Sequence, residues 1–327
     1  MANEGGRVLT LTMNPSLDKS TETERVGPGR KLRCGPIRHE PGGGGINVSR
    51  VLRRLGQPTV SAYVCGGSMG EELARLLDEE EVAQHAIPIE PSIRESLMVM
   101  ESGSNQQYRF AFPGPELGTA DVKRCIDAMI DLARDARVVV FSGSLPPGVP
   151  SALYRELAER LTNGDRRVLV DSSGAALKES LDAPVFLIKP NLGEFERLVG
   201  TSLPNDEAIA RAAQRLIKET SVRHIAVSLG AGGMALAGGD RFVRIASPTV
   251  RIRSRVGAGD SAVGGIAYGL ANGMSVYDAV QVGVSAGAAT VMSPGTHLCQ
   301  RADVERLFEG LSGRPLEPAG PGESERS

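Results

Sequence analysis

Short apolar runs alternate along this chain with segments of helical periodicity, and this alternation most constrains the fold. Buried strands are predicted at residues 8–12, 137–141, 168–171, 185–188 and 225–229. Helices are predicted near 68–79, 119–135, 150–163, 192–199 and 205–219. The order favours βαβ units, and therefore an α/β fold with a mostly parallel central sheet flanked by helices.

Two polar or alternating segments interrupt this order, at about 18–40 and 95–113. In the second segment Tyr108, Phe110 and Phe112 recur at period two after a turn. We expect a small antiparallel sheet that serves as a lid or a dimer face, the alternative being an edge extension of the main sheet. Residues 1–311 are expected to form one domain, and residues 312–327 a disordered tail rich in Pro, Gly, Glu and Ser.

Composition excludes several classes of function. The net charge is −2, Trp is absent and aromatic residues make up 4%, so no nucleic-acid surface is expected. The four cysteines form no CxxC and the four histidines no HExxH, which argues against a zinc site and favours a reducing compartment. No signal peptide or bilayer-length apolar run is found, so we expect a cytoplasmic protein with no membrane partner.

A glycine-rich turn leads into a helix at Gly257, Ala258, Gly259 and Asp260. The first N–H groups of a helix have no intrahelical partner, and small residues let a phosphate approach them closely. An aspartate beside such an anion hole can take a proton from an attacking hydroxyl. The alternative is an aspartate that only caps the helix.

A second glycine run, 42–45, leads into a helix with apolar residues at positions 48, 51, 52 and 55. Four consecutive glycines suit a backbone that lies against a ligand, and Asn47 offers a donor and an acceptor to a polyol. The alternative is a flexible loop with an ordinary cap. Further polar residues follow the predicted strands, where ligands of parallel sheets bind: Asn14, Asp18, 142–144, Asp171, 189–191 and 228–230.

The chain has neither GxxxxGK[ST] nor GxGxxG after its first strand. Instead, six motifs occur in the order of the ribokinase-like carbohydrate kinase family, which the chain resembles over nearly its whole length: NPSLD at 14–18, the glycine run to Asn47, SGSLPPG at 142–148, KPN at 189–191 with Glu194, SLG at 228–230, and VGAGD at 256–260. Within the family it is most similar to ATP-dependent 6-phosphofructokinases of the minor-isozyme type. Gly44 stands where 1-phosphofructokinases and tagatose-6-phosphate kinases usually carry lysine.

The resemblance implies roles for individual residues. Asp260 would be the catalytic base, and Gly257, Ala258 and Gly259 the anion hole. Substrate-binding positions are Asp18, Lys31, Gly43, Asn47, Arg94, Ser142 and Ser144. Of these, Lys31 and Arg94 would hold the sugar's own phosphate, Lys31 from a neighbouring subunit in a dimer. From the residues alone, Asp18 could be a turn former, and Lys31 and Arg94 solvated surface charges.

The resemblance also implies a nucleotide and two cations. ATP contacts match Lys189, Asn191, Ser228, Gly230 and Gly233. Glu194 would organise Mg²⁺ through water, the alternative being an exposed acid in a helical first turn. A K⁺ site matches Ser254, Val256, Thr290, Ser293 and Gly295, although Ser293 and His297 replace the asparagine and arginine typical of similar enzymes.

The expected reaction is phosphorylation of fructose 6-phosphate by ATP at the C1 hydroxyl, by a homodimer. Another phosphosugar kinase, acting on tagatose 6-phosphate or fructose 1-phosphate, is the first alternative. An inert sugar- or nucleotide-binding regulator is the second, and the presence of Asp260 with its preceding glycines argues against it.

Overall fold

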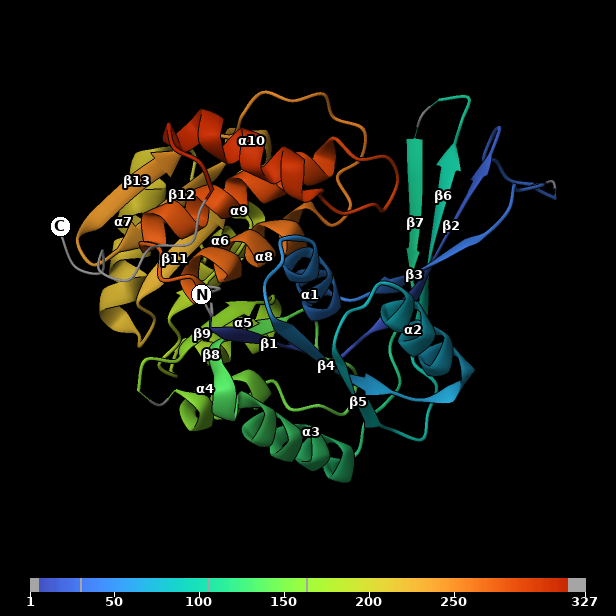
Figure 1. Cartoon of the computed structure of the whole chain (residues 1–327), viewed down its shortest axis with the longest axis horizontal. Coiled ribbons are helices and arrows are strands. Elements are labelled where there is room, and N and C mark those ends of the chain that lie inside the picture. The colour runs from blue at the N-terminus through green and yellow to red at the C-terminus, as the bar shows by residue number, and fades with distance from the viewer. Residues whose placement is uncertain (1–5, 30, 105, 163, 317–327) are drawn as a thin grey trace.

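The computed structural model describes residues 6–29, 31–104, 106–162 and 164–316 (Figure 1). Within these residues the main sheet has nine strands in the order β13-β12-β11-β10-β9-β8-β1-β4-β5. All neighbouring pairs from β11 to β5 are parallel, and β12 and β13 add an antiparallel edge. The strands are β1 Arg7–Thr12, β4 Thr59–Cys65, β5 Gln84–Pro88, β8 Ala136–Ser142, β9 Arg167–Asp171, β10 Leu187–Ile188, β11 His224–Ser228, β12 Met234–Gly238 and β13 Arg241–Ile245.

Helices cover both faces of this sheet and form two separate cores with it. One core contains α1 Gly44–Arg54, α8 Ala258–Ala271, α9 Val276–Val291 and α10 Arg301–Ser312. The other contains α2 Gly67–Glu79, α3 Thr119–Leu132, α4 Leu153–Leu161, α5 Gly174–Ser180, α6 Leu192–Val199 and α7 Asp206–Glu219. Strands that face helices on both sides must be apolar throughout, which is why they read as continuous apolar runs.

The predicted α/β fold with a mostly parallel sheet is confirmed. Sequence periodicity located five of the nine main-sheet strands of the described chain. It missed β4 and β5, which lie toward one edge, and the β12–β13 hairpin. It also missed α9, whose residues are apolar on nearly every side because the helix is buried between α8 and α10.

The segments that interrupt the alternation form a second sheet of four strands in the described chain, in the order β3-β2-β6-β7. Its strands are β2 Ser16–Thr23, β3 Arg38–Gly42, β6 Arg94–Glu101 and β7 Gln106–Ala111. The sheet stands beside α1 and α2 at one end of the molecule (Figure 1). It is separate from the main sheet, so the edge-extension alternative is wrong.

The strand directions of the second sheet differ from the prediction. β2–β3 and β6–β7 are antiparallel, but β2 and β6 pair in parallel. Strands that follow one another in the chain can pair in antiparallel fashion, whereas β2 and β6 are separated along the chain by β3, α1, β4, α2 and β5. The sheet is therefore mixed, and its central pair joins two distant segments of the chain.

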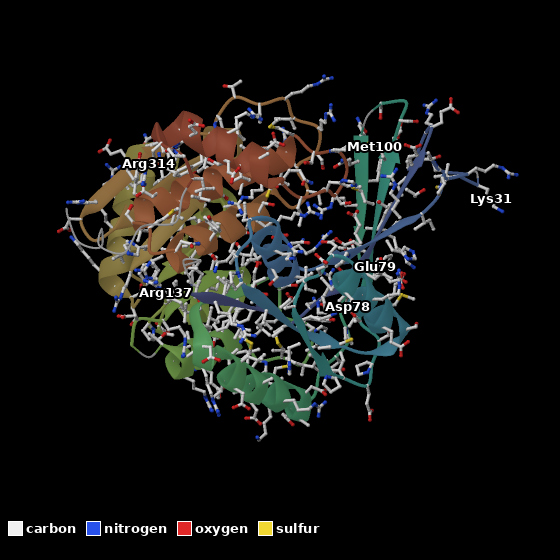
Figure 2. The ribbon with its side chains drawn as sticks, in the orientation of Figure 1. Lys31, Asp78, Glu79, Met100, Arg137 and Arg314 are labelled. Carbon is white, nitrogen blue, oxygen red and sulfur yellow. The ribbon has the colours of Figure 1, made fainter. Side chains whose placement is uncertain are left out.

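The first residues of the predicted tail contact the rest of the protein. Arg314, labelled in Figure 2, forms an ion pair with Asp278 at 2.7 Å. The Leu316 side chain is buried. The remainder of that predicted tail, 317–327, lies outside the described residues. Among the helices of the described chain, none combines the length and the apolar character that crossing a membrane requires.

Candidate active site

The two glycine runs meet at the carboxyl ends of the parallel strands. Gly257 precedes α8 with a left-handed φ of 74°, and Asp260 lies in the first turn of that helix. The Asp260 carboxylate accepts a hydrogen bond of 2.8 Å from Nδ2 of Asn47 on α1. Within the described residues no side chain caps α8, so Asp260 does not have the capping role that was its alternative.

The first glycine run is packed tightly against strand ends. A Cβ on Gly44 would overlap the Ser142 hydroxyl and lie 2.9 Å from the backbone nitrogen of Gly143. The backbone nitrogen of Ile46 donates to Thr12 Oγ1 at 2.9 Å, which ties the start of α1 to β1. The run is therefore a defined turn in contact with the strand ends.

A buried lysine and three carboxylates lie close together at the start of α8. Lys189 Nζ pairs with Asp171 Oδ1 at 3.0 Å, and Ser142 Oγ donates to Asp171 Oδ2 at 3.2 Å. Burial opposes the charge on Lys189, but Asp171, Asp260 and Glu194 together outweigh it and raise the pKa of the ammonium. Lys189 is thus a buried, permanently charged cation within the site.

Burial raises the pKa of Asp260 to about 6, and the nearby Asp171 carboxylate adds to the increase. The hydrogen bond from Asn47 and the charge of Lys189 act in the opposite direction. A carboxylate with this pKa is mostly ionised at neutral pH and is a stronger base than an exposed aspartate.

Two cavities border the start of α8. The smaller, of about 220 Å³, is lined by Gly44, 142–144, 171–173, Glu194 and Asp260. The larger, of about 480 Å³, is lined on the α8 side by Ala258, Gly259 and Ala262. Three predicted nucleotide residues, Ser228, Gly230 and Gly233, also line the larger cavity. The predicted anion-hole residues Ala258 and Gly259 thus line the larger cavity, and Asp260 lines the smaller.

Asp18 and Arg94 lie side by side in the second sheet. Asp18 is within β2 and accepts a hydrogen bond of 2.6 Å from Ser16, so it is not a turn former. Arg94 pairs with Ser16 in register and donates from Nε to the Asn14 carbonyl at 3.3 Å. Burial raises the pKa of Asp18, whereas Ser16, Arg94, Arg109 and Arg50 oppose the increase.

Other predicted substrate residues surround this pair. Gly43 precedes α1 with φ 123°, and the Ser144 hydroxyl accepts a hydrogen bond of 3.1 Å from Asn14 Nδ2. Arg109, on β7, was not predicted as a site residue, although its charge faces Asp18. The alternation of residues 108–112 could have indicated this, because alternate residues share a face of the sheet.

Lys31 is far from the other predicted substrate residues. It is exposed in the extended segment between β2 and β3, and it extends from the outer edge of the second sheet (Figure 2). Within one chain the structure does not bring Lys31 to Arg94.

Asn191 and Glu194 cap the start of α6 reciprocally. Asn191 Oδ1 accepts from the Glu194 backbone nitrogen at 2.9 Å, and Glu194 Oε2 accepts from the Asn191 backbone nitrogen at 2.8 Å. This is the helical first turn named as the alternative for Glu194, yet the same side chain also lines the smaller cavity. In the described part of the chain, no three His, Cys, Asp or Glu side chains are grouped to hold a metal ion. A magnesium ion at Glu194 would therefore take most ligands from phosphate and water.

The residues of the predicted potassium site come from two adjacent segments. The backbone nitrogens of Arg253 and Ser254 donate to the Val291 carbonyl at 2.7 and 3.3 Å. This pairing brings Ser254 and Val256 to the end of α9, where Thr290, Ser293 and Gly295 lie. The Thr290 hydroxyl already donates to Ser261 at 2.7 Å and accepts from the Cys299 nitrogen at 3.0 Å.

Comparisons with known proteins agree on one family. A family model described as pfkB family carbohydrate kinase matches residues 12–303. The ATP-dependent 6-phosphofructokinase isozyme 2 of Mycobacterium tuberculosis is 41% identical over 311 residues, covering 95% of this chain and 91% of that protein. Its counterpart from Escherichia coli K12 is 36% identical over 307 residues, covering 94% and 99%.

Solved structures of Escherichia coli phosphofructokinase-2 have the same fold, each covering 94% of this chain and 99% of that one. The complex with potassium has a TM-score of 0.90 at 36% identity. The complex with fructose-6-phosphate and a tetrameric inhibited form each have a TM-score of 0.88 at 35% identity.

Proposed function

Because the chain belongs to the pfkB family of carbohydrate kinases, we propose that it transfers the γ-phosphoryl group of ATP to the C1 hydroxyl of fructose 6-phosphate. The products are ADP and fructose 1,6-bisphosphate. The observation that carries the proposal is the position of Asp260, in the first turn of α8, which borders both cavities.

In this mechanism the smaller cavity receives the sugar end that reacts. Asp260 accepts the proton of the C1 hydroxyl as that oxygen attacks the γ-phosphorus and the bond to the ADP oxygen breaks. Asn47, whose Nδ2 is 2.8 Å from the carboxylate, also lies beside the attacking hydroxyl. Arg94, close to Asp18 in the second sheet, binds the distal phosphate of the sugar. The hydroxyl groups of the sugar are contacted by Asp18, Gly43, Ser142 and Ser144.

The larger cavity receives the nucleotide. ATP is contacted there by three residues that line this cavity, Ser228, Gly230 and Gly233. The N–H groups at the start of α8 bind the phosphoryl group that is transferred. Small residues at 257–259 leave those N–H groups accessible, and the partial positive charge of the helix start favours the developing negative charge. Lys189 and Asn191 complete the contacts to the phosphates, with Lys189 supplying a buried positive charge.

Two cations fit the donor groups present. Mg²⁺ would be organised through water by Glu194, which lines the smaller cavity, and would neutralise phosphate charge. K⁺ would be held at Ser254, Val256, Thr290, Ser293 and Gly295, beside the start of α8. The carbonyls and hydroxyls of this set are the oxygen donors that such a cation requires. The potassium complex of the similar Escherichia coli enzyme supports this site.

The second sheet would close over the sugar and form the contact of a homodimer. Ile37, Phe110 and Phe112 expose 58%, 47% and 51% of their surfaces there, and large apolar side chains gathered on one small sheet favour burial by a partner. Lys31 would then reach the sugar phosphate in the neighbouring subunit. Residues up to 316 would act as one catalytic domain with this sheet as its lid.

The function is tested by coupled ADP release with fructose 6-phosphate, tagatose 6-phosphate, fructose 1-phosphate and fructose. We expect the highest kcat/KM for fructose 6-phosphate, and at least about a thousand-fold less for fructose, which lacks the anchored phosphate. A preference for tagatose 6-phosphate or fructose 1-phosphate would refute the proposed substrate, but the proposed kinase activity would stand. Absence of ADP release with every sugar would indicate an inert binding protein.

A further inference from the structure

A buried arginine lies directly behind Asn47. Arg50 is one turn further along α1, and its side chain is 3% exposed. Its Nη1 donates to Asn47 Oδ1 and to the Pro41 carbonyl, each at 3.1 Å. Its Nε and Nη2 donate to the two carboxylate oxygens of Glu80, at 2.8 and 2.5 Å. Glu80, at the end of α2, thus holds the guanidinium by a two-point contact.

These contacts leave the Asn47 amide one favourable orientation. Its Nδ2 faces the Asp260 carboxylate, and its Oδ1 faces the Arg50 guanidinium. With the amide reversed, an oxygen acceptor would face the carboxylate and an NH₂ donor would face the guanidinium. Both hydrogen bonds would be lost, in a region where unpaired polar groups are costly.

We infer that Arg50 is a positioning residue: together with Glu80 it holds the Asn47 amide so that Nδ2 is aimed at the Asp260 carboxylate. Arg50 acts through Asn47 and does not itself touch the base. The inference rests on the proposed function, because it takes Asp260 as the base of the phosphoryl transfer. It adds two residues to the proposed site, Arg50 and Glu80, which are not part of the glycine-run motifs.

Loss of the contact that holds Asn47 would change the pH dependence of turnover. The groups that act on Asp260 are the carboxylates of Asp171 and Asp18, which raise its pKa, and Lys189 and Asn47, which lower it. When Asn47 is no longer held, its donor leaves the carboxylate and the pKa of Asp260 rises. A base must be ionised to act, so the acidic limb of kcat moves to higher pH.

The test compares Arg50→Met with Arg53→Met in the full chain. Arg53 lies on the same helix and also links α1 to the end of α2, through Glu81 (Nε to the Glu81 carbonyl, 3.1 Å). It is a matched control because its side chain is 46% exposed and its hydrogen bonds are to Glu81. Arg50→Met is expected to lower kcat roughly ten- to a hundred-fold, with KM for MgATP within about two-fold. Its acidic limb should move up by about half a pH unit or more, while Arg53→Met leaves kcat and the limb unchanged.

Two further variants make the result decisive. Arg50→Lys keeps a donor and should restore part of kcat. In an Asn47→Ala background, Arg50→Met should cause no additional loss of kcat, because the residue through which it acts is already gone. Should Arg50→Met fail to fold, Glu80→Gln, which keeps Arg50 but removes the charge that orients it, should shift the limb in the same direction.

The inference is overturned if Arg50→Met matches Arg53→Met in kcat and pH profile, or if the losses from Asn47→Ala and Arg50→Met simply multiply. If Arg50→Met does not fold, the inference is overturned when the acidic limb of kcat for Glu80→Gln lies at the same pH as in the wild-type protein. Failure of the proposed function looks different: the unmodified protein would not phosphorylate fructose 6-phosphate, or Asp260→Asn would retain full turnover.

Discussion

At the scale of single residues, the site balances burial against a few directed contacts. Burial favours the protonated form of Asp260, and Asp171 adds to that effect, but Asn47 and Lys189 limit the increase. The resulting pKa of about 6 keeps the carboxylate mostly ionised at neutral pH. A base that holds its proton more strongly than an exposed aspartate, yet is free to accept one, suits abstraction from a sugar hydroxyl.

The first prediction concerns this base. Protonation of Asp260 removes its acceptor, so kcat should decline as the pH falls through about 6. Asp260→Asn, which keeps the shape but cannot accept the proton, should lower kcat by about 10²–10⁴-fold and abolish that limb. Steady-state kinetics between pH 5 and pH 8 measure both effects; a variant with more than about a third of wild-type kcat would refute the assignment.

A second prediction concerns the sugar phosphate. Arg94→Ala should raise KM for fructose 6-phosphate roughly ten-fold or more and change KM for ATP little, since it removes one charge-assisted contact. Lys19→Ala is the control, because Lys19 is in the same sheet but pairs with Glu95 at 2.6 Å. Equal effects of Arg94→Ala on the two KM values would contradict the placement.

At the scale of elements, the close packing of α8 on α9 holds the proposed anion hole in place. The two helices approach at glycines: a Cβ on Gly265 would lie 2.7 Å from the Val282 carbonyl oxygen, and one on Gly269 would lie 2.6 Å from the Ala279 Cα. Small residues at such positions let two backbones come close together, and this contact supports the helix that begins at Ala258 and carries Asp260 in its first turn.

The third prediction tests this packing. Gly265→Ala should lower the free energy of unfolding by about 1–3 kcal/mol, because neither backbone can move away without opening the core. Gly310→Ala, in α10 with open space around the site of the added methyl, should instead raise it by up to about 1 kcal/mol. Urea unfolding of the two variants decides the matter; equal changes would show that the α8–α9 contact tolerates a methyl group.

At the scale of the whole molecule, one chain does not bring every predicted substrate residue together. Lys31 extends outward from the second sheet (Figure 2). It lies two residues from Arg33, whose carbonyl accepts from Thr23 at one end of β2, whereas Arg94 pairs with Ser16 at the other end. A dimer through this sheet would bring the lysine of one subunit to the site of the other. The catalytic unit would then be the dimer, and the loss of a lysine would affect the neighbouring site.

The fourth prediction follows from this arrangement. Lys31→Ala and Asp260→Asn should each be nearly inactive alone at limiting fructose 6-phosphate. Refolded together, they should recover about a quarter of wild-type activity, because half of the dimers are mixed and each mixed dimer has one intact site. Recovery in mixtures is measured against each variant refolded alone. No recovery would show that Lys31 serves its own chain or no site.

The fifth prediction concerns the end of the described chain. A chain ending at Leu316 should be more stable than one ending at residue 311, by about 1.5–3 kcal/mol, mostly through burial of the Leu316 side chain. The Arg314–Asp278 pair adds little because it is partly exposed. Thermal unfolding compares the two; identical melting temperatures would show that residues 312–316 contribute nothing.

The amino-acid sequence alone was enough to predict the fold class and the family, and to single out Asp260 as the proposed base. Strand periodicity depends on local burial, and a glycine turn before Asp260 depends on local backbone geometry, so both are visible in a short window. Glu194 is a similar case, because a capping box is a pattern of neighbouring residues.

Only the tertiary structure decided which distant groups meet. Periodicity does not reveal that Asn47 bonds to Asp260, that Arg50 and Glu80 stand behind Asn47, or that β2 pairs in parallel with β6. Nor does it reveal that Lys31 and Arg94 lie toward opposite ends of β2. A buried polar side chain bonds to whichever group packs beside it. When the two groups are distant in sequence, they become neighbours only after the sheets and helices that carry them have packed together.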